Sequence, residues 1–201
     1  MTRPPVVILA GGEGRRMGGA DKALVPLGDD VLIGHLLNRL RPQAGALAIS
    51  SNAPPGAFAR YGLAVLPDPL PGRPGPLAGI LAGMGWAAGM GADYVISAAT
   101  DTPWPPADLI DRLCAAQSGA GPVLAADHDA GGALRLHPTF GLWPVALRGD
   151  LRAALNSGQR RVRQWAADHG ASVAVFDGAE PFFNINTPED LARAGTMIAS
   201  R

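Results

Sequence analysis

A continuous apolar run near the start of the chain leads directly into a glycine-rich loop. Residues Val6 to Ala10 are apolar and mostly β-branched, which is typical of a strand buried in a parallel sheet. The following loop, from Gly11 to about Asp30, begins with five glycines in nine residues. Glycine permits conformations and close backbone approaches that other residues do not. In α/β sheets such loops lie at the carboxyl edge, where ligands bind.

Apolar strands and helical segments alternate along the rest of the chain. Strands are predicted at 46–50, 63–66, 94–99, 123–126 and 173–176, partly at 134–143, and an extended stretch at 182–186. Helices are predicted at 31–41, 77–89, 106–117, 145–156, 160–169 and 187–199. This alternation predicts an α/β fold with a single domain over 1–201, a Rossmann-like, mostly parallel sheet with helices on both faces. Segment 127–145 is expected to be an irregular insertion or an antiparallel edge strand.

The composition excludes several classes of protein. Its 27 glycines and 19 prolines could indicate disorder, but 47% hydrophobic residues and zero net charge are typical of a packed chain. Equal numbers of basic and acidic residues, 17 each, argue against a nucleic-acid partner. The single cysteine, Cys114, excludes an internal disulfide. The first apolar run is too short for a signal peptide or a membrane span, so we expect a cytoplasmic protein without a membrane partner.

The glycine-rich loop has the character of a polyphosphate site. Exposed N–H groups of consecutive glycines bind anions, and Arg15, Arg16 and Lys22 add positive charge. Lys22 is the only lysine beside 16 arginines. The loop is not a P-loop, because that motif requires Gly-Lys-Ser/Thr and Lys22 follows Asp21. A dinucleotide fingerprint fits poorly, since the second strand ends at Asn52 rather than at an acidic residue.

Motifs spread along the chain resemble those of one enzyme family. They are Leu9-Ala10-Gly11-Gly12 with Arg16-Met17-Gly18 and Lys22, Asp68 before Gly75-Pro76-Leu77-Ala78-Gly79, Asp101-Thr102-Pro103, His137-Pro138-Thr139, Arg160-Arg161-Val162, and Asn184-Ile185-Asn186-Thr187-Pro188. Over residues 6 to 193, this ordered set resembles the molybdenum cofactor guanylyltransferases of the nucleotidyltransferase superfamily. The resemblance implies a sugar-nucleotide-transferase-type fold, with a nucleotide-binding part at about 6–105 and a pterin-substrate part at about 106–195.

The resemblance also implies a reaction. Members of this family transfer GMP from GTP to the phosphate of molybdopterin, releasing pyrophosphate and forming the guanine dinucleotide cofactor. It implies Mg²⁺ as the cofactor and GTP and molybdopterin as small-molecule substrates. Transient contact with cofactor-delivery proteins or molybdoenzymes is a further expectation.

Site residues follow by matching these motifs. The expected catalytic residues are Lys22, Arg16 and Asp101, with Asp101 as metal ligand. The expected GTP-binding residues are Leu9, Ala10, Gly11, Gly12, Lys22, Asn52, Asp68, Gly75, Gly79 and Asp101. The pterin substrate is assigned to Arg160, Arg161, Asn184 and Asn186. The residues themselves support two of these points: Asp101 follows a buried strand and faces the glycine-rich loop, and Asn184 and Asn186 alternate along an extended segment, so they share a face.

Simpler roles stay open for several of these residues. Asp101 and Asp68 each stand before a proline turn, Arg160 and Arg161 could start a solvated helix, and His137 fits a structural or a functional role equally. Three other activities compete with guanylyl transfer. They are a molybdopterin cytidylyltransferase, another small-molecule nucleotidyltransferase, and a nucleotide-binding regulator without transfer activity.

Overall fold

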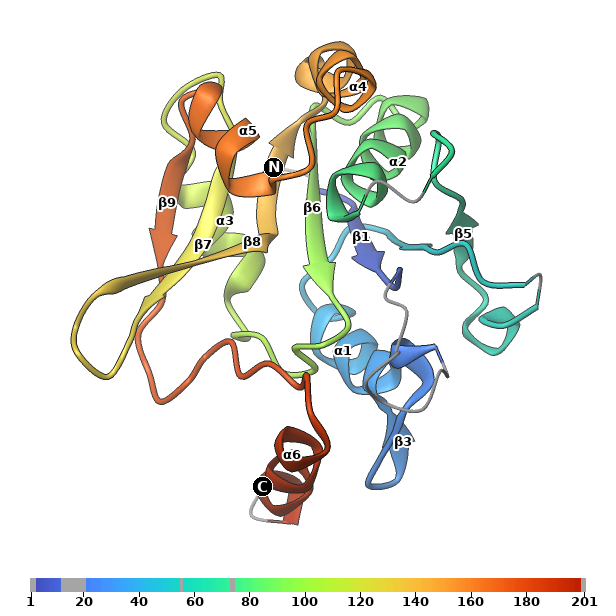
Figure 1. The fold of residues 1–201 in the computed structure, drawn as a ribbon, viewed down its shortest axis with the longest axis vertical. Helices are drawn as coiled ribbons and strands as arrows, with labels where there is room; N and C mark the ends of the chain where they lie inside the picture. Colours follow the sequence, from blue (N-terminus) through green and yellow to red (C-terminus); the bar gives the residue numbers. More distant parts are fainter. Residues whose placement is uncertain (1–2, 12–20, 55, 73–74, 200–201) are drawn as a thin grey trace.

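A seven-stranded sheet forms the centre of the molecule (Figure 1). The computed structural model describes residues 3–11, 21–54, 56–72 and 75–199. Seven strands are β1 (Val6–Leu9), β4 (Leu47–Ser50), β5 (Ala64–Leu66), β6 (Tyr94–Ala99), β7 (Val123–His128), β8 (Leu134–Pro144) and β9 (Ser172–Val175). They lie in the order β5-β4-β1-β6-β8-β7-β9, and β8 alone runs against its neighbours. The predicted mostly parallel sheet is therefore confirmed.

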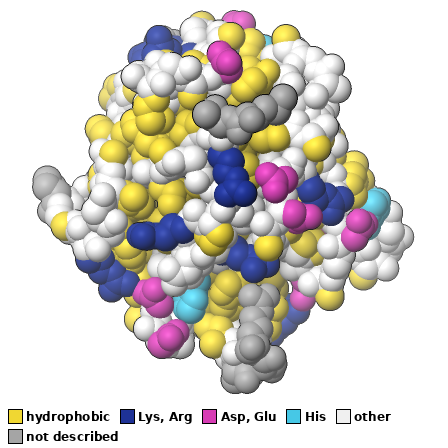
Figure 2. Space-filling model, turned by 180° about the vertical axis from the view of Figure 1, so that it is seen from behind, with side chains coloured by type: hydrophobic (Ala, Val, Ile, Leu, Met, Phe, Trp, Pro, Cys, Tyr) yellow, Lys and Arg dark blue, Asp and Glu magenta, His cyan; other side chains and the backbone are white. Residues whose placement is uncertain are grey.

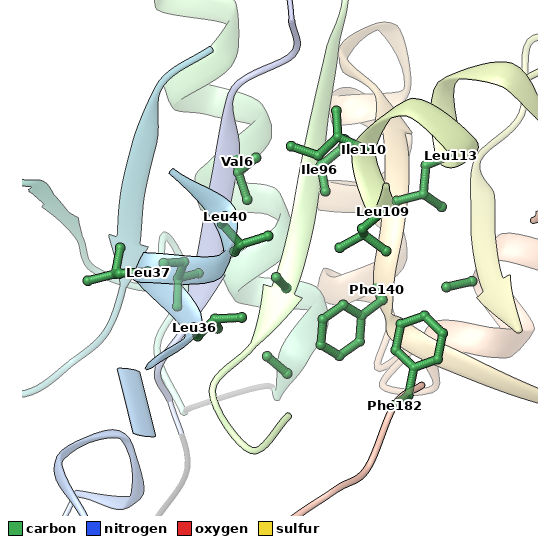
Figure 3. Packing of buried hydrophobic residues seen from close by; sticks show 14 of the residues in the cluster. Val6, Leu36, Leu37, Leu40, Ile96, Leu109, Ile110, Leu113, Phe140 and Phe182 are labelled. Atoms are coloured by element: carbon green, nitrogen blue, oxygen red, sulfur yellow. The ribbon is translucent and has the colours of Figure 1, made fainter. Parts of the chain in front are cut away.

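Helices cover both faces of this sheet, as the alternation predicts. Helices α1 (Leu32–Leu40) and α3 (Leu109–Ala115) pack on one face. Figure 3 shows Leu40 of α1 near Val6 and Leu109 of α3 near Ile96 and Phe140. Helices α2 (Pro76–Gly89), α4 (Arg148–Asn156) and α5 (Val162–Asp168) share the core of the other face. Short 3₁₀ helices occupy Lys22–Leu24, Ala59–Tyr61 and Val145–Leu147. The helix expected from residue 106 begins at Leu109.

Strand β8 corrects the expectation for segment 127–145. It is neither an insertion nor an edge strand but an 11-residue strand between β6 and β7. The residues typical of loops form only the tight turn between β7 and β8. In this turn the Asp129 carboxylate accepts hydrogen bonds from the N–H groups of Gly131 and Ala133. Pro138 also disfavours an interior strand, because it cannot donate to the ladder. It lies at the register shift, where Leu124 pairs with Gly141 but Ala125 pairs with His137.

A third, smaller core lies where the long first loop was expected. Strands β2 (Pro26–Leu27) and β3 (Asp30–Val31) form a short antiparallel hairpin. Together with α6 (Pro188–Ala199), this region buries Val25, Leu27, Leu32, Ile185 and Ala194 against one another. Two segments from opposite ends of the chain are thereby held side by side. This small core determines the position of Lys22 relative to the Asn184–Asn186 segment.

The outer surface carries mixed charge. On the face seen in Figure 2, basic and acidic side chains are interspersed, as expected from their equal numbers. Among the described residues, no helix combines the length and apolarity needed to cross a bilayer.

Glycines allow α2 to lie unusually close to the sheet. A Cβ atom built on Gly83 would be 2.4 Å from Val7 Cγ1, and one on Gly79 would be 2.7 Å from Leu9 Cδ2. At Gly83 a methyl group would also come within 2.8 Å of Val7 Cβ, so the helix would have to move away from β1, whereas at Gly79 the side chains of Leu9 and Ser50 would have to shift. The sequence assigns no role to Gly83, and the structure gives it one in helix–sheet packing.

We expect Gly83→Ala to lower the free energy of unfolding by about 1–3 kcal/mol, the usual cost of overpacking a core. Gly85→Ala is the matched control on the same helix, because a Cβ there meets nothing within 4 Å. Since alanine favours helix by about 1 kcal/mol over glycine, that variant should match or exceed the wild type. Urea unfolding of the three proteins measures both effects. Equal stability of the two variants would contradict the close packing described here.

Candidate functional site

The strand order places four predicted site segments along one edge of the sheet. Asp68 follows β5, Asn52 follows β4, Leu9 to Gly11 follow β1, and Asp101 follows β6. These four strands are neighbours and parallel, so their carboxyl ends meet at the same edge. Three strand spacings of about 4.8 Å give a row roughly 14 Å long. Such a row is long enough to hold a nucleotide base at one end and its phosphates at the other.

Lys22 is at one end of this row. Its Nζ donates a hydrogen bond to Asn186 Oδ1 at 2.7 Å and lies 3.5 Å from Asp101 Oδ2. The side chains of Lys22 and Asp101 are 14% and 28% exposed, so the ammonium group is partly shielded from water while still open to a ligand. Partial shielding strengthens its interaction with anions. The structure thus joins a lysine assigned to GTP and an asparagine assigned to the pterin.

Backbone contacts hold each of these three residues in place. The Asp21 carboxylate caps the turn that carries Lys22, accepting a hydrogen bond from the Ala23 N–H at 3.0 Å. Burial raises the pKa of Asp21, and the Ala23 hydrogen bond opposes that rise. The Ile185 N–H donates to the Asp101 carbonyl at 2.7 Å. The site is therefore positioned by main-chain geometry on both sides.

The start of α6 fixes Asn186 in the same way. Asp190 accepts hydrogen bonds from the N–H groups of Asn186 and Thr187, and the Thr187 hydroxyl accepts one from the Asp190 N–H. These reciprocal bonds form a capping box in which Thr187 is the N-cap residue of α6. The backbone hydrogen bond from Asn186 is the main cause of a lowered pKa at Asp190.

Asn52 and Asp68 form a reciprocal pair at the other end of the row. Asn52 Nδ2 donates to Asp68 Oδ2 at 2.7 Å, and the Asp68 N–H donates to Asn52 Oδ1 at 2.9 Å. Asn52 is exposed and Asp68 is half-buried. Because the pair fixes the carboxylate, its other oxygen has a defined position from which to accept hydrogen bonds from a ligand.

The glycines predicted to bind GTP have different environments. Gly75 precedes α2 with φ of 82°, a conformation that favours glycine. Gly79 is buried beneath Leu9 and Ser50, so it serves the approach of α2 to the sheet. Ala10 is buried, and its N–H donates to the Ser50 carbonyl. Gly11 is exposed at the end of β1.

Other predicted residues lie apart from this row or outside the described part of the chain. Arg160 donates to the carbonyls of Leu155 and Gln159, closing the end of α4. The Arg161 N–H donates to the Gln159 side chain. Within the described residues, no contact joins either arginine to Lys22, Asp101 or Asn186. Gly12 and Arg16 lie outside the described residues.

Comparison with known proteins gives this edge of the sheet a family context. Residues 6–173 match the model of the MobA-like NTP transferase domain. A molybdenum cofactor guanylyltransferase from Cereibacter sphaeroides is 51% identical over 192 residues, covering 96% of this chain and 95% of that protein. One from Mesorhizobium japonicum is 46% identical over 201 residues, with the same coverage of each chain.

The chain belongs to the molybdenum cofactor guanylyltransferase family. This confirms the resemblance drawn from the motifs, and it makes the chain a nucleotidyltransferase. A solved structure of molybdopterin-guanine dinucleotide biosynthesis protein A from Archaeoglobus fulgidus is similar, with a TM-score of 0.74 at 25% identity over 98% of this chain and all of that one.

The same fold extends beyond this guanylyltransferase family. The 2-C-methyl-D-erythritol 4-phosphate cytidylyltransferase of Thermus thermophilus superimposes with a TM-score of 0.71 at 22% identity, covering 99% of this chain and all of that one. At that identity the likeness shows the fold alone. The sugar-nucleotide-transferase-type architecture is thus confirmed, while the cytidylyltransferase alternative is not favoured by the near relatives.

The metal that the family resemblance implies has one predicted ligand here, Asp101. Within the ranges that the structure describes, no group of three or more His, Cys, Asp or Glu side chains could hold a metal ion. This arrangement fits Mg²⁺, which usually takes one or two protein carboxylates and completes its shell with phosphates and water.

A buried ion-pair cluster in this guanylyltransferase was missed by the sequence reasoning. The Asp127 side chain is only 2% exposed, and Arg135 binds both its oxygens, from Nε at 2.8 Å and from Nη2 at 2.6 Å. His137 Nε2 lies 3.0 Å from Asp127 Oδ1, although the angles there are not those of a hydrogen bond. Asp127 and Arg135 pair across β7 and β8, and His137 follows two residues later on the same face. The sequence signal for this cluster was the presence of charged residues, Asp127, Arg135 and His137, within strands that are otherwise apolar.

Two pKa shifts accompany this cluster. Burial of Asp127 acts to raise its pKa, but the contacts with Arg135 and His137 outweigh it and the pKa is lowered. Burial lowers the pKa of His137, and the nearby Asp127 carboxylate opposes this only in part. His137 is therefore neutral at pH 7, stacked on Phe182 with ring centroids 4.4 Å apart.

The lowered pKa of His137 makes stability depend on pH. The unfolded chain binds a proton at His137 near pH 6.5, whereas the folded chain resists protonation there. His137 therefore makes its full contribution to the free energy of unfolding above pH 6.5. This contribution is lost as the pH falls from 6.5 through the pKa of His137 in the folded chain, with a slope of at most about 1.4 kcal/mol per pH unit. We expect His137→Phe, which keeps a ring against Phe182, to weaken this dependence. Urea unfolding of both proteins from pH 7.5 to 5 measures how the free energy of unfolding depends on pH. If the free energies of the two proteins fell in parallel with pH, the role assigned to His137 would be disproved.

Proposed function

We propose that the protein transfers GMP from GTP to the phosphate of molybdopterin, releasing pyrophosphate and forming the guanine dinucleotide cofactor. The observation that carries the proposal is the position of the chain's one lysine. Lys22 lies between Asp101 and Asn186 at one end of a row of strand termini whose other end holds the Asn52–Asp68 pair. The names of the near relatives support the choice of substrates.

In this proposal GTP lies along the carboxyl edge of the sheet. The fixed Asp68 carboxylate accepts hydrogen bonds from guanine N–H groups, and Asn52 keeps it oriented. Leu9 to Gly11 line the middle of the row beneath the ribose and the first phosphate. Lys22 balances the phosphate charge, and the family motif assigns Arg16, which lies outside the described residues, to the same role.

The transfer step requires little covalent chemistry from the protein. A phosphate oxygen of molybdopterin forms a bond to the α-phosphorus of GTP, and the bond from that phosphorus to the oxygen bridging the α- and β-phosphates breaks. Pyrophosphate leaves with the electron pair. The attacking phosphate monoester, with a second pKa of about 6, is already largely ionised near pH 7, so no general base is needed. Positioning and charge stabilisation supply the rate.

Asp101 would hold Mg²⁺ in this reaction. Bound there, the ion would offset the negative charge that develops on the phosphates. Lys22, whose Nζ lies 3.5 Å from Asp101 Oδ2, would bind the same phosphates, and Asn186 keeps its ammonium group in position through the 2.7 Å hydrogen bond. We further propose a cytoplasmic enzyme that passes its product to delivery proteins or molybdoenzymes.

Pyrophosphate release from the purified protein, supplied with molybdopterin, Mg²⁺ and either GTP or CTP, tests the proposal. We expect release with GTP and little with CTP. Release with CTP alone would make the protein a cytidylyltransferase, and release with neither would remove the proposed transfer activity.

Asp68→Asn tests the assigned guanine contact. The variant replaces one acceptor oxygen with an N–H donor, which leaves a guanine N–H group unpaired. We therefore expect the KM for GTP to rise about tenfold to a hundredfold. Asp111→Asn, on the exposed side of α3, is the matched control and should keep the wild-type KM. An unchanged KM in Asp68→Asn would place the guanine elsewhere.

A further inference from the structure

A pocket of about 360 Å³ opens beside the Lys22 site, on the side away from Asn52 and Asp68. It lies between the start of β8, residues 180–184 and the start of α6, and its polar lining includes Arg135, Glu180, Asn184 and Arg193. Its size is within the range of small-molecule sites.

The pocket is continuous with the candidate active site through one short stretch of chain. Asn184 lines the pocket, the Ile185 N–H binds the Asp101 carbonyl, and Asn186 binds Lys22. A molecule with its body in the pocket could therefore extend one end past Asn184 toward the ammonium group of Lys22. The second substrate of the proposed reaction must bind in this way. Its phosphate has to reach the α-phosphorus of GTP, while the rest of the molecule needs a separate binding space.

Arg135 lines this pocket and is held in place by two hydrogen bonds to Asp127. The buried Asp127 carboxylate takes its Nε and one Nη2 hydrogen, which leaves three N–H donors of the guanidinium. The Arg135 side chain is 48% exposed while that of Asp127 is 2% exposed. The ion pair is thus buried only on the aspartate side, and the guanidinium is oriented before any ligand arrives, so binding orders it at little entropic cost.

The opposite wall supplies hydrogen-bond acceptors. Glu180 lines the pocket with φ of 54°, a left-handed conformation that is uncommon for a residue other than glycine and that tends to be retained at ligand sites. It is paired with Arg193, whose guanidinium lies over the Phe183 ring. Donors on one wall and an acceptor on the other match a flat heterocycle with carbonyl and ring-nitrogen acceptors and with N–H donors.

We propose that this pocket binds the pterin ring of the second substrate, and that Arg135, oriented by Asp127, determines specificity for it. The inference rests on the proposed function and assigns the pterin contact to Arg135 and Asn184 rather than to Arg160 and Arg161. Asp127 is a positioning residue, since it reaches the ligand only through Arg135.

Steady-state kinetics of Arg135→Lys tests the proposal. Lysine keeps a positive charge for Asp127 but lacks the planar fork. We expect the KM for molybdopterin to rise at least about tenfold and the KM for GTP to change less than twofold. Arg152→Lys, exposed on α4, should leave both constants unchanged. An unchanged KM for molybdopterin, or an equal rise in both constants, would overturn the proposal.

Two further measurements separate this inference from folding defects and from the proposed reaction. If Arg135→Lys does not fold, a double variant carrying Asp127→Asn and Arg135→Gln replaces the ion pair by a neutral hydrogen bond. We expect this variant to show the same rise in the KM for molybdopterin and the same small change in the KM for GTP. Anaerobic titration of the wild type with molybdopterin alone gives a Kd that does not depend on transfer. That Kd should rise at least about tenfold in Arg135→Lys even if no pyrophosphate is formed. Equal binding by the two proteins, or no binding by the wild type, would refute the pocket assignment.

Discussion

Lys22→Met should reduce pyrophosphate release from GTP and molybdopterin by at least about a hundredfold. Methionine keeps the apolar stem of the side chain but removes the ammonium group that lies 2.7 Å from Asn186 Oδ1 and 3.5 Å from Asp101 Oδ2. Loss of one preorganised group that stabilises developing charge typically costs a factor of about 10² to 10³. Initial rates at saturating substrate concentrations measure the effect.

The control for this experiment separates charge loss from loss of structure. Arg152→Met removes a cation from the exposed surface of α4 and should keep the wild-type rate. Thermal unfolding of Lys22→Met should differ from that of the wild type by only a few degrees, because the substitution removes one hydrogen bond and one 3.5 Å ion pair while the apolar stem stays. A folded Lys22→Met enzyme with near-normal turnover would remove the assigned role of this lysine.

Asp101→Asn should lower the rate by a similar or larger factor and change its response to Mg²⁺. Asparagine has nearly the same shape but lacks the negative charge that a divalent cation requires. The Ile185 N–H contact is made by the Asp101 main chain, so it survives the substitution. We expect the Mg²⁺ concentration for half-maximal rate to increase at least about tenfold, measured by titrating Mg²⁺ at fixed GTP.

Asp177→Asn is a suitable control for Asp101→Asn. Its carboxylate is 86% exposed and its contact with Arg112 is long, at 3.8 Å, so both the rate and the Mg²⁺ titration should be those of the wild type. If Asp101→Asn kept full activity at the wild-type Mg²⁺ concentration, the metal ligand would have to be a different residue.

The periodicity of the sequence was sufficient to predict most of the fold. Continuous apolar runs such as Val6 to Ala10 can be buried only inside a sheet, and the alternating helices require parallel connections between strands. Strand β8 was predicted in part, but its interior position was missed because Gly131, Gly132 and Pro138 have local preferences for turns. Its interior position is set by pairing with β6 and β7, a tertiary effect that local preferences do not contain.

The site was predictable to the extent that it depends on strand ends. The rule that ligands bind at the carboxyl edge selected the loop after the first strand, Asn52 and Asp101, whereas Asp68 was assigned from the family motif. The structure places all of them after neighbouring strands at that edge. The contact between Lys22 and Asn186 was not predictable, because the two residues are 164 positions apart and meet through the small core of the β2–β3 hairpin and α6. The Asp127–Arg135 pair depends likewise on strand register, which the sequence did not specify.

The position of β8 has a consequence for attempts to divide this protein. An N-terminal fragment ending near residue 105 would keep the row from Asp68 to Asp101, yet it would expose the edge of β6 that β8 covers. An uncovered, apolar central strand pairs readily with other chains. Such a fragment should aggregate rather than bind nucleotide as a monomer, and a circularly permuted chain that retains β8 is the more promising route to a minimal binding module.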